Sequence, residues 1–360
     1  MRVAVLGSGN GGCAVAFDCG IHGHEVRLFE FEQFPENVAS IAASGGIEAE
    51  GELEGFAPIA YAGHDVGAAL DGADVVFAVG AAYSTRPFAE ACKPHLCTGL
   101  IVIVCPGSCG GSIEFKNAAG LPLRDQGVIV AETSTLPYAV RMIEPGRIRA
   151  FLKLRAGVFV AAVPAANTPE VIEKVAEVYP CLEPARNVLQ TSLQNANPII
   201  HPAVTLLNAA LIERTGGHLR FYEEGVTPAV GRLIEALDRE RIAIGRKLGL
   251  EVVPDPQLGC RQGYMQDATY DTGYSRAAGF RGIRAQSSLD HRYLNEDVGY
   301  GLVFMQSLAR QVAAETPCMS ALARLASVLM DRDYAAEAKR TMASLGLAKY
   351  TPEELDRLLA

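Results

Sequence analysis

The chain has 360 residues, of which 49% are hydrophobic and 20% are charged. This composition is typical of a globular protein large enough for two hydrophobic cores, and it excludes a disordered or fibrous chain. A net charge of -9 without a basic run argues against nucleic acid and anionic membrane surfaces as partners. We therefore expect small-molecule ligands.

The sequence shows no sign of membrane insertion, secretion or metal binding. No segment approaches the roughly 20 apolar residues that cross a membrane, and glycines interrupt the apolar start of the chain from Gly7 onward. The nine cysteines form no CxxC pair, and the histidines have no spacing typical of a metal site. These features predict a cytoplasmic protein with reduced thiols and no metal.

The first element is an apolar strand at residues 1–6 that runs directly into a glycine-rich turn. In a dinucleotide-binding unit, Gly7 permits the tight turn, Gly9 lets the backbone approach a pyrophosphate, and Gly12 lets the next helix pack on the strand. Asn10 and Gly11 lie in the same turn, where free helix N–H groups bind anions. These five residues are the first predicted cofactor contacts.

A second strand at residues 25–29 ends at Glu30, about the spacing at which an acidic residue binds the ribose hydroxyls. NAD or NADP is therefore the expected cofactor, and Glu30 favours NAD because its carboxylate would repel a 2′-phosphate. Arg27 weakens this preference, although strand alternation points it away from Glu30. The alternative interpretation is an ordinary strand–turn–helix unit without a ligand.

Four more apolar runs have the length and composition of strands that are buried on both faces of a sheet. They alternate with helical segments, which is typical of a parallel, doubly wound sheet. We expect an α/β, Rossmann-like dinucleotide-binding domain at residues 1–185. The four runs are residues 74–79, 100–104, 127–131 and 158–163.

Two of these runs are followed by residues that could face a ligand. Gly107 lies in the glycine-rich segment 105–111, where it would let the nicotinamide half of the cofactor lie close to the backbone. Glu132 and Thr133 follow the next strand and could hold an ammonium or hydroxyl group of a substrate. A plain strand-to-helix connection explains the glycines equally well, and polar residues are common at strand ends.

Residues 186–360 have the hydrophobic spacing of helices and are predicted to form an all-α substrate and catalytic domain. Thr227 and Pro228 suit the start of a long helix that ends near Gly249, and residues 351–354 form a capping box. The glycine- and tyrosine-rich segment 259–282 fits either a surface loop or a substrate lid. A homodimer would use the helical half.

In a protein with a nucleotide-binding half followed by an all-helical half, we expect the reaction in the cleft between them and a proton donor from the helical half. His201 is the candidate for this donor. Asn197 precedes it by four residues and would share its helix face as a substrate contact. Two prolines disfavour a regular helix here and leave polar groups near the imidazole. The alternative is a structural histidine at a kinked helix start, and the spacing does not decide between the two.

Asp297 is the candidate carboxylate that would orient the histidine and stabilise its protonated form. In the alternative interpretation, Glu296 pairs with Arg292 four residues earlier, and the segment is a solvated helix face. Nothing in the sequence by itself brings residues 201 and 297 together.

Seven segments of the chain together resemble the opine dehydrogenases, the NAD/NADP octopine and nopaline dehydrogenase family, over nearly the full length. The His-Pro pair at residues 201–202 with the later Glu-Asp pair at 296–297 is the specific part of the resemblance. The segments are residues 7–12, 106–111, 132–134, 197–202, 222–228, 239–244 and 292–297.

The resemblance implies a Rossmann domain followed by a helical domain, with His201 as the catalytic histidine and Asp297 as its partner. It gives Arg292 a supporting role, either binding a substrate carboxylate or organising Asp297. The implied activity is NAD(P)H-dependent reduction of the imine formed from an amino acid and an α-keto acid, and the reverse oxidation of the secondary amine. The segments do not indicate which amino acid is used.

Two other functions compete with this one. A carbonyl reductase of the ketopantoate or glycerol-phosphate dehydrogenase type has a similar build, but it generally uses a lysine that the segment around His201 lacks. A non-catalytic NAD-sensing protein would leave the histidine and Asp297 without a chemical role.

Overall fold

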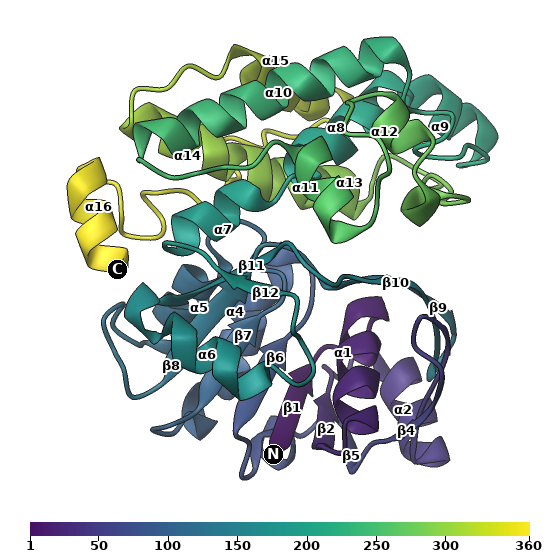
Figure 1. Ribbon diagram of the computed structural model, residues 1–360, viewed down its shortest axis with the longest axis vertical. Helices are drawn as coiled ribbons and strands as arrows, with labels where there is room; N and C mark the ends of the chain where they lie inside the picture. Colours follow the sequence, from purple (N-terminus) through teal and green to yellow (C-terminus); the bar gives the residue numbers. More distant parts are fainter. The chain divides into compact units, whose positions relative to one another are not determined.

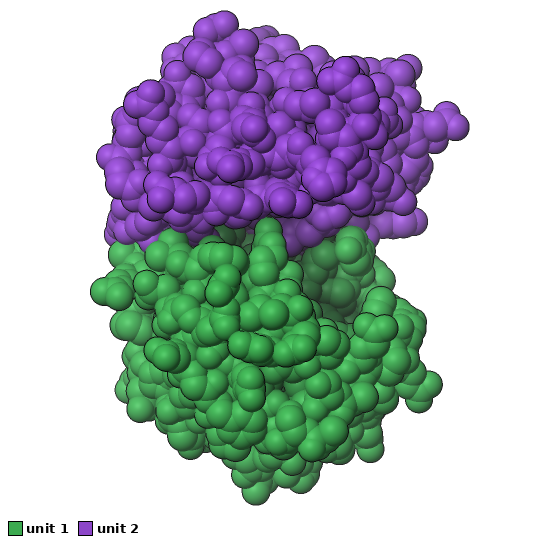
Figure 2. Space-filling view, turned by 90° about the vertical axis from the view of Figure 1, so that its right-hand side faces the viewer, with its two compact units in different colours: residues 1–191, 358–360 green, residues 192–357 purple.

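The computed structural model describes residues 1–360, which form two compact units (Figure 2). Unit 1 comprises Met1–Thr191 and Leu358–Ala360, and unit 2 comprises Ser192–Arg357. The chain passes from unit 1 to unit 2 within helix α7 (Val188–Gln194). The boundary that we predict from the sequence, between residues 185 and 186, precedes this helix.

The centre of unit 1 is an eight-stranded sheet with the order β12-β11-β8-β7-β6-β1-β2-β5 (Figure 1). β1 lies between β2 and β6, and the strand order runs outward from it in both directions, as expected for a doubly wound sheet. Such folds bind nucleotides at the point where the order reverses. The strands are β1 (Arg2–Leu6), β2 (Glu25–Phe29), β5 (Tyr61–Gly63), β6 (Val75–Ala78), β7 (Ile101–Val104), β8 (Ile129–Thr133), β11 (Val158–Val163) and β12 (Leu182–Pro184).

This sheet is mixed rather than wholly parallel, which corrects one part of the prediction. Six neighbouring strands, β5, β2, β1, β6, β7 and β8, run parallel to one another. β11 is antiparallel to β8, and β12 is parallel to β11. Parallel neighbours need a crossover connection. The chain between β8 and β11 instead forms a hairpin of two strands, so residues 158–163 return in the opposite direction.

A second, four-stranded sheet in unit 1 was not predicted. Its order is β4-β3-β10-β9, and its strands are β3 (Gly46–Gly51), β4 (Gly55–Pro58), β9 (Tyr138–Glu144) and β10 (Arg147–Lys153). Helix α1 (Asn10–Ile21) packs against this sheet, and Asp18 in its middle is fully buried. The Asp18 carboxylate accepts a hydrogen bond from the Tyr138 hydroxyl at 2.5 Å and lies 2.7 Å from the Lys153 ammonium.

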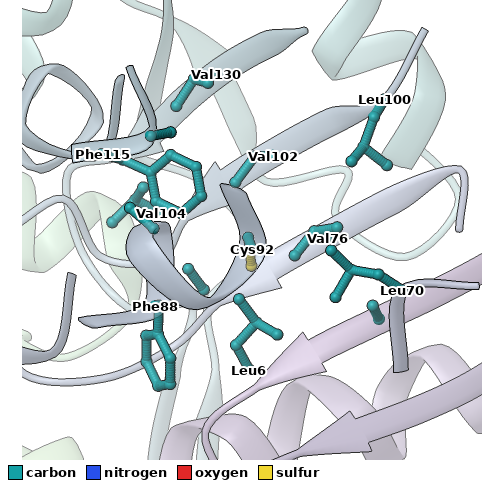
Figure 3. Close-up of a cluster of buried hydrophobic side chains, with 14 of the residues drawn as sticks. Leu6, Leu70, Val76, Phe88, Cys92, Leu100, Val102, Val104, Phe115 and Val130 are labelled. Carbon is teal, nitrogen blue, oxygen red and sulfur yellow. The ribbon is translucent and has the colours of Figure 1, made fainter. Parts of the chain in front are cut away.

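A hydrophobic cluster covers one face of the main sheet. Figure 3 shows aliphatic side chains of β1, β6, β7 and β8 packed against Phe88 and Cys92 of α4 and Phe115 of α5. Each fully buried aliphatic or aromatic side chain contributes about 1.5–3 kcal/mol. The helices of unit 1 other than α1 and α7 are α2 (Pro35–Ser44), α3 (Val66–Leu70), α4 (Thr85–Cys92), α5 (Gly111–Ala119) and α6 (Thr168–Val175).

Unit 2 is helical, as predicted. Its longest helix, α10, begins and ends as expected: the Thr227 side chain accepts from the Val230 N–H, Pro228 occupies the first position, and Gly249 follows the end with a φ of +65°. The capping box is also confirmed, since Thr351 and Glu354 exchange hydrogen bonds of 2.8 and 3.3 Å. The helices are α8 (Asn197–Leu207), α9 (Ala209–Thr215), α10 (Pro228–Lys247), α11 (Asp255–Gln262), α12 (Thr272–Ser275), α13 (Arg292–Asn295), the π-helical turn η5 (Asp297–Leu302), α14 (Val303–Gln311), α15 (Pro317–Leu329) and α16 (Pro352–Leu359).

None of these helices combines the length and hydropathy that a membrane-spanning helix needs.

Candidate functional site

The turn between β1 and α1 in unit 1 can be built only with glycine at two positions. Gly7 has a φ of +102°, and a Cβ there would lie 2.2 Å from the Val79 carbonyl oxygen at the end of β6. A Cβ on Gly12 would lie 1.8 Å from the Gly7 carbonyl oxygen. The two glycines therefore let α1 begin in direct contact with the ends of β1 and β6, at the reversal of strand order.

The first turn of α1 is open to an anion. Gly9 is the N-cap residue and provides no side-chain cap, and no atom lies within 4 Å of the position that its Cβ would take. The N-terminal N–H groups and the helix dipole favour negative charge at this place. The Asn10 side chain points away from this helix start, since its oxygen accepts a hydrogen bond from the Met142 N–H at 2.7 Å. The Cβ position of Gly11 faces the side chains of Leu136 and Val79 at 3.1 Å.

Glu30 lies next to this turn, as the spacing predicts. One carboxylate oxygen accepts hydrogen bonds from the Ser8 N–H at 2.8 Å and the Ser8 hydroxyl at 3.1 Å, and the other accepts from the Phe31 N–H at 3.0 Å. The side chain is largely buried, with 8% exposed. Burial, together with the negative charge of Glu30, raises the pKa of the Cys13 thiol to about 12, so this thiol stays protonated and donates to the Ser8 carbonyl.

Arg27 faces away from Glu30. Its guanidinium lies 3.0 Å from the Glu25 carboxylate and donates to the Ala68 carbonyl at 2.8 Å. Strand alternation therefore points Arg27 away from Glu30, as expected from the sequence, and Arg27 no longer weakens the preference for NAD that Glu30 predicts.

The segment after β7 forms a second cluster with the end of β8. A Cβ on Gly107 would lie 2.5 Å from the Glu132 carboxyl carbon, and the Gly107 N–H donates to the Thr133 carbonyl at 2.9 Å. Glu132 is fully buried and accepts from the Ser112 N–H and hydroxyl at 2.8 and 2.7 Å and from the Thr191 hydroxyl at 2.6 Å. The Glu132 carboxylate therefore joins the start of α5 to the middle of α7, and Gly107 packs against it.

These features of unit 1 fit a bound NAD or NADP. An uncapped helix start, an open Cβ position at Gly9 and a carboxylate at the end of β2 are the elements that hold the pyrophosphate and the ribose in a Rossmann site. The residues that we predict to contact the cofactor remain Gly7, Gly9, Asn10, Gly11, Gly12, Glu30 and Gly107, with Asn10 able to contribute its backbone N–H because its side-chain oxygen is bound to Met142.

Unit 2 brings together the histidine and carboxylate that the sequence leaves apart. His201 Nδ1 lies 2.8 Å from Asp297 Oδ2, and the two residues are 6% and 3% exposed. We assign the proton on Nδ1 to the bond with the carboxylate, which leaves Nε2 as the nitrogen that exchanges a proton. A carboxylate so placed also stabilises the imidazolium form.

The local folds of α8 and η5 explain this pairing. α8 continues through Pro202, so His201 lies on a helix that starts at Asn197. Gly301 in η5 packs directly on the first turn of α8, because a Cβ there would lie 2.3 Å from the Pro198 ring. π-helical turns are frequent at functional sites, and this one carries Asp297 at its first position.

Aromatic rings that the sequence analysis did not identify enclose His201. Its imidazole stacks on Tyr293 with ring centres 3.9 Å apart and meets the edge of Phe221 at 6.0 Å. Its Nε2 lies 3.1 Å from the Tyr222 hydroxyl. Tyr222 and Tyr293 both fall within segments of the family resemblance, which is the signal that could have indicated them.

Asn197 lies on α8 with His201, and Arg292 lies on α13, which directly precedes η5 and Asp297. The Arg292 guanidinium is 3.1 Å from Glu296, as in the alternative interpretation, and its side chain is 44% exposed. Asn197 begins α8, one turn before His201, and is partly exposed. Glu296 is buried, so Arg292 combines a half-exposed ion pair with a position beside Tyr293.

The glycine- and tyrosine-rich segment 259–282 is packed into unit 2 rather than being a simple surface loop. Tyr274 is fully buried and donates to Asp255, and Tyr270 donates to Asp238 at 2.6 Å. Asp238 also pairs with the buried Arg241 at 2.5 Å. Burial, with a contribution from Asp238, raises the pKa of Asp255 to about 6.

A doubly wound sheet with an open glycine turn, together with a helical unit that holds a buried His–Asp pair, defines a two-domain NAD(P)-dependent oxidoreductase. Residues 184–330 match the family described as NAD/NADP octopine/nopaline dehydrogenase, alpha-helical domain. An opine dehydrogenase from Arthrobacter sp. (strain 1C) is 35% identical over 97% of this chain and 96% of its own. The chain therefore belongs to the opine dehydrogenase family.

The solved structures agree with this fold. Octopine dehydrogenase in complex with NADH and agmatine matches with a TM-score of 0.79 at 16% identity, covering 99% of this chain and 97% of its own. A ketopantoate reductase from Ralstonia eutropha matches with a lower TM-score of 0.60 at 20% identity, covering 92% and 99%. The shared architecture explains why a carbonyl reductase was a reasonable alternative from the sequence.

Family membership decides between the functions considered above. The protein is an NAD(P)-dependent oxidoreductase that acts on CH–NH groups. It joins the amine of an amino acid to an α-keto acid through an imine, which it reduces, and it catalyses the reverse oxidation of the secondary amine.

Proposed function

We propose that His201 is the general acid and base of this reaction and that Asp297 holds its ring. The 2.8 Å hydrogen bond between Nδ1 and the carboxylate, buried within unit 2, is the observation that carries this proposal. It fixes the tautomer in which Nε2 takes up or gives the proton. A positioned acid or base of this kind contributes roughly 10²–10⁴-fold to the rate.

Condensation needs such a group at two moments. As the amine adds to the keto carbon, one of its protons passes to the former carbonyl oxygen and gives a neutral carbinolamine, and this hydroxyl gains a second proton as it leaves as water. His201 Nε2 can carry the first proton from nitrogen to oxygen and, in its protonated form, can give the second, which leaves an iminium and a neutral histidine; Asp297 stabilises the protonated ring. A bound nicotinamide cofactor supplies the hydride that reduces the imine.

We propose that unit 1 binds this cofactor through the glycine turn and Glu30 and prefers NAD to NADP. The Glu30 carboxylate is held beside Ser8 at the end of β2, where a 2′-phosphate would meet its charge. Arg27, the nearest cation in the sequence, is bound to Glu25 and Ala68. A stable preference for NADPH would contradict this assignment.

Arg292, Asn197, Glu132 and Thr133 are the proposed substrate contacts. Both substrates carry a carboxylate, and Arg292 offers a partly exposed guanidinium that binds such groups well. Asn197 adds an amide one turn before His201. Glu132 and Thr133 are proposed to bind the amine of the substrate. Glu132 already accepts hydrogen bonds from Ser112 and Thr191, so these bonds rearrange when it binds the amine.

One set of assays tests these assignments. NADH consumption is followed with pyruvate alone and with pyruvate plus each member of an amino acid panel; we expect consumption only when both organic substrates are present. His201→Ala should lower turnover by at least 10²-fold with an unchanged dissociation constant for NADH. Asp297→Asn should lower turnover less, again without affecting NADH. Near-normal turnover of His201→Ala would refute the assignment.

We also propose a homodimer and a cytoplasmic location. The exposed apolar side chains of Leu325, Val328 and Leu329 on α15 support a subunit interface, and nine cysteines without a disulfide support a reducing compartment. Light scattering that gives the 38.3 kDa mass of one chain would contradict the dimer. Recovery of the native protein in a secreted fraction would contradict the location.

A further inference from the structure

The Tyr222 hydroxyl lies within hydrogen-bond distance of Nε2, the nitrogen through which His201 is proposed to exchange protons. The Nδ1 side of the ring is bound to Asp297, and Nε2 lies 3.1 Å from the Tyr222 oxygen. His201 and Tyr222 are each 6% exposed, so bulk water does not readily replace either partner. Any proton that reaches or leaves Nε2 must therefore pass this phenol or displace it.

Packing on both sides fixes this contact. The Tyr222 ring stacks on Phe280 at 4.2 Å and meets the edge of Phe221 at 5.0 Å. The imidazole is held by Tyr293 at 3.9 Å. Two buried rings with several aromatic neighbours cannot rotate freely, and the hydrogen bond is a fixed part of the site rather than a chance contact of a mobile side chain.

A phenol in this place can work in both directions. It donates to Nε2 when the histidine is neutral, and its oxygen accepts from Nε2–H when the histidine is protonated, which leaves its own proton directed elsewhere. On the assignment of His201 proposed above, we propose that Tyr222 is a further catalytic residue that relays protons between Nε2 and the substrate oxygen that leaves as water.

The relay balances without any added reactant. As the carbon–oxygen bond of the carbinolamine breaks, Tyr222 gives its proton to the departing hydroxyl, and the Nε2 proton moves to the Tyr222 oxygen. Water leaves with the electron pair of the broken bond, the nitrogen lone pair forms the C=N bond of an iminium, and the histidine becomes neutral. Tyr222 ends each cycle as a neutral phenol.

Tyr222→Phe removes only the hydroxyl and keeps the stacked ring. We expect its turnover number to fall roughly 10²-fold, with unchanged NADH affinity and thermal unfolding. Tyr264→Phe is the matched control, because Tyr264, like Tyr222, stacks on Phe280, with ring centres 5.0 Å apart. It removes a hydroxyl from the same aromatic group without changing the contact at Nε2, and its turnover should stay within twofold of the original protein.

A proton inventory separates a relay from mere positioning. Single-turnover rates measured over a series of H2O/D2O mixtures should give a curved plot for the unmodified protein, since two protons move together, and a straight line for Tyr222→Phe. A turnover within twofold of normal for Tyr222→Phe, or a plot of the same shape for both proteins, overturns the relay. If His201→Ala is active, the proposed function fails; if it is inactive while Tyr222→Phe is normal, only the relay fails.

Discussion

Two glycines in the turn between β1 and α1 give opposite predictions when each is replaced by alanine. At Gly12, a new Cβ would lie 1.8 Å from the Gly7 carbonyl oxygen, which is 1.2 Å inside the 3.0 Å that real Cβ atoms respect. Because the obstacle is backbone, α1 must shift away from β1. At Gly9, no atom lies within 4 Å of the new Cβ, and the φ of -72° is accessible to alanine.

The two replacements should therefore differ in what they lose. Overpacking of the kind expected for Gly12→Ala costs about 1–3 kcal/mol, which for a unit of this size lowers Tm by about 2–12 °C. Gly9→Ala should cost within about 1 kcal/mol, the usual range for an N-cap change. If its Cβ displaces a pyrophosphate from a backbone N–H, the loss of about 1.5–3 kcal/mol weakens NADH binding about 10- to 100-fold.

Thermal unfolding without cofactor, followed by circular dichroism, and fluorescence titration with NADH at 25 °C measure both quantities on each variant. Normal NADH affinity of Gly9→Ala would show that the pyrophosphate does not approach this backbone. An unchanged Tm of Gly12→Ala would refute the packing argument. Gly9→Ala is the specific probe of binding, because it should weaken NADH binding with Tm nearly unaffected, whereas Gly12→Ala moves the start of α1 and should lower both Tm and NADH affinity.

Three further changes test other parts of the structure. Glu30→Gln should reduce the ratio of kcat/KM for NADH over NADPH by roughly fivefold, as it removes one repulsive charge worth on the order of 1 kcal/mol; an unchanged ratio would exclude Glu30 from the ribose site. Asp18→Asn should lower stability by about 2–4 kcal/mol, less than for a fully buried pair because Lys153 is 22% exposed, and an unmoved urea midpoint would contradict this. The pKa of Asp255 is raised from 3.8 to about 6 in the folded protein, so stability falls as pH rises from about 4 to 6. Asp255→Asn should remove up to about 3 kcal/mol of that fall while still accepting from Tyr274, and a Tm-against-pH curve of unchanged slope would argue against it.

Features set by neighbouring residues could be predicted from the sequence. The glycine turn, Glu30 at the end of β2 and the start of α10 at Thr227 depend on short-range sterics and capping, and the structure shows each as expected. The second sheet was missed because its strands are half exposed and lack a continuous apolar run. The prediction of a parallel strand at residues 158–163 was wrong, because a hairpin replaces the crossover helix before β11.

The His201–Asp297 pair could not be derived from spacing. It depends on Gly301 packing on Pro198 and on a π-helical turn, neither of which has a recognisable local pattern. Only the family resemblance connected the two residues in advance. Tyr222 was overlooked because an aromatic residue in a helical half usually belongs to a core, and its role emerges only from the 3.1 Å contact with the imidazole.

Asp297, His201 and Tyr222 all belong to unit 2, whereas Glu30 and the glycine turn belong to unit 1, and the hydrogen bonds described above for the two sets go to different residues. Energetic effects of groups without common partners usually add within about 0.5 kcal/mol. We therefore expect cofactor preference and proton transfer to be separable in this enzyme. A variant redesigned at Glu30 should keep its pH–rate profile, so that cofactor use can be engineered, or can drift in evolution, without retuning the acid–base chemistry.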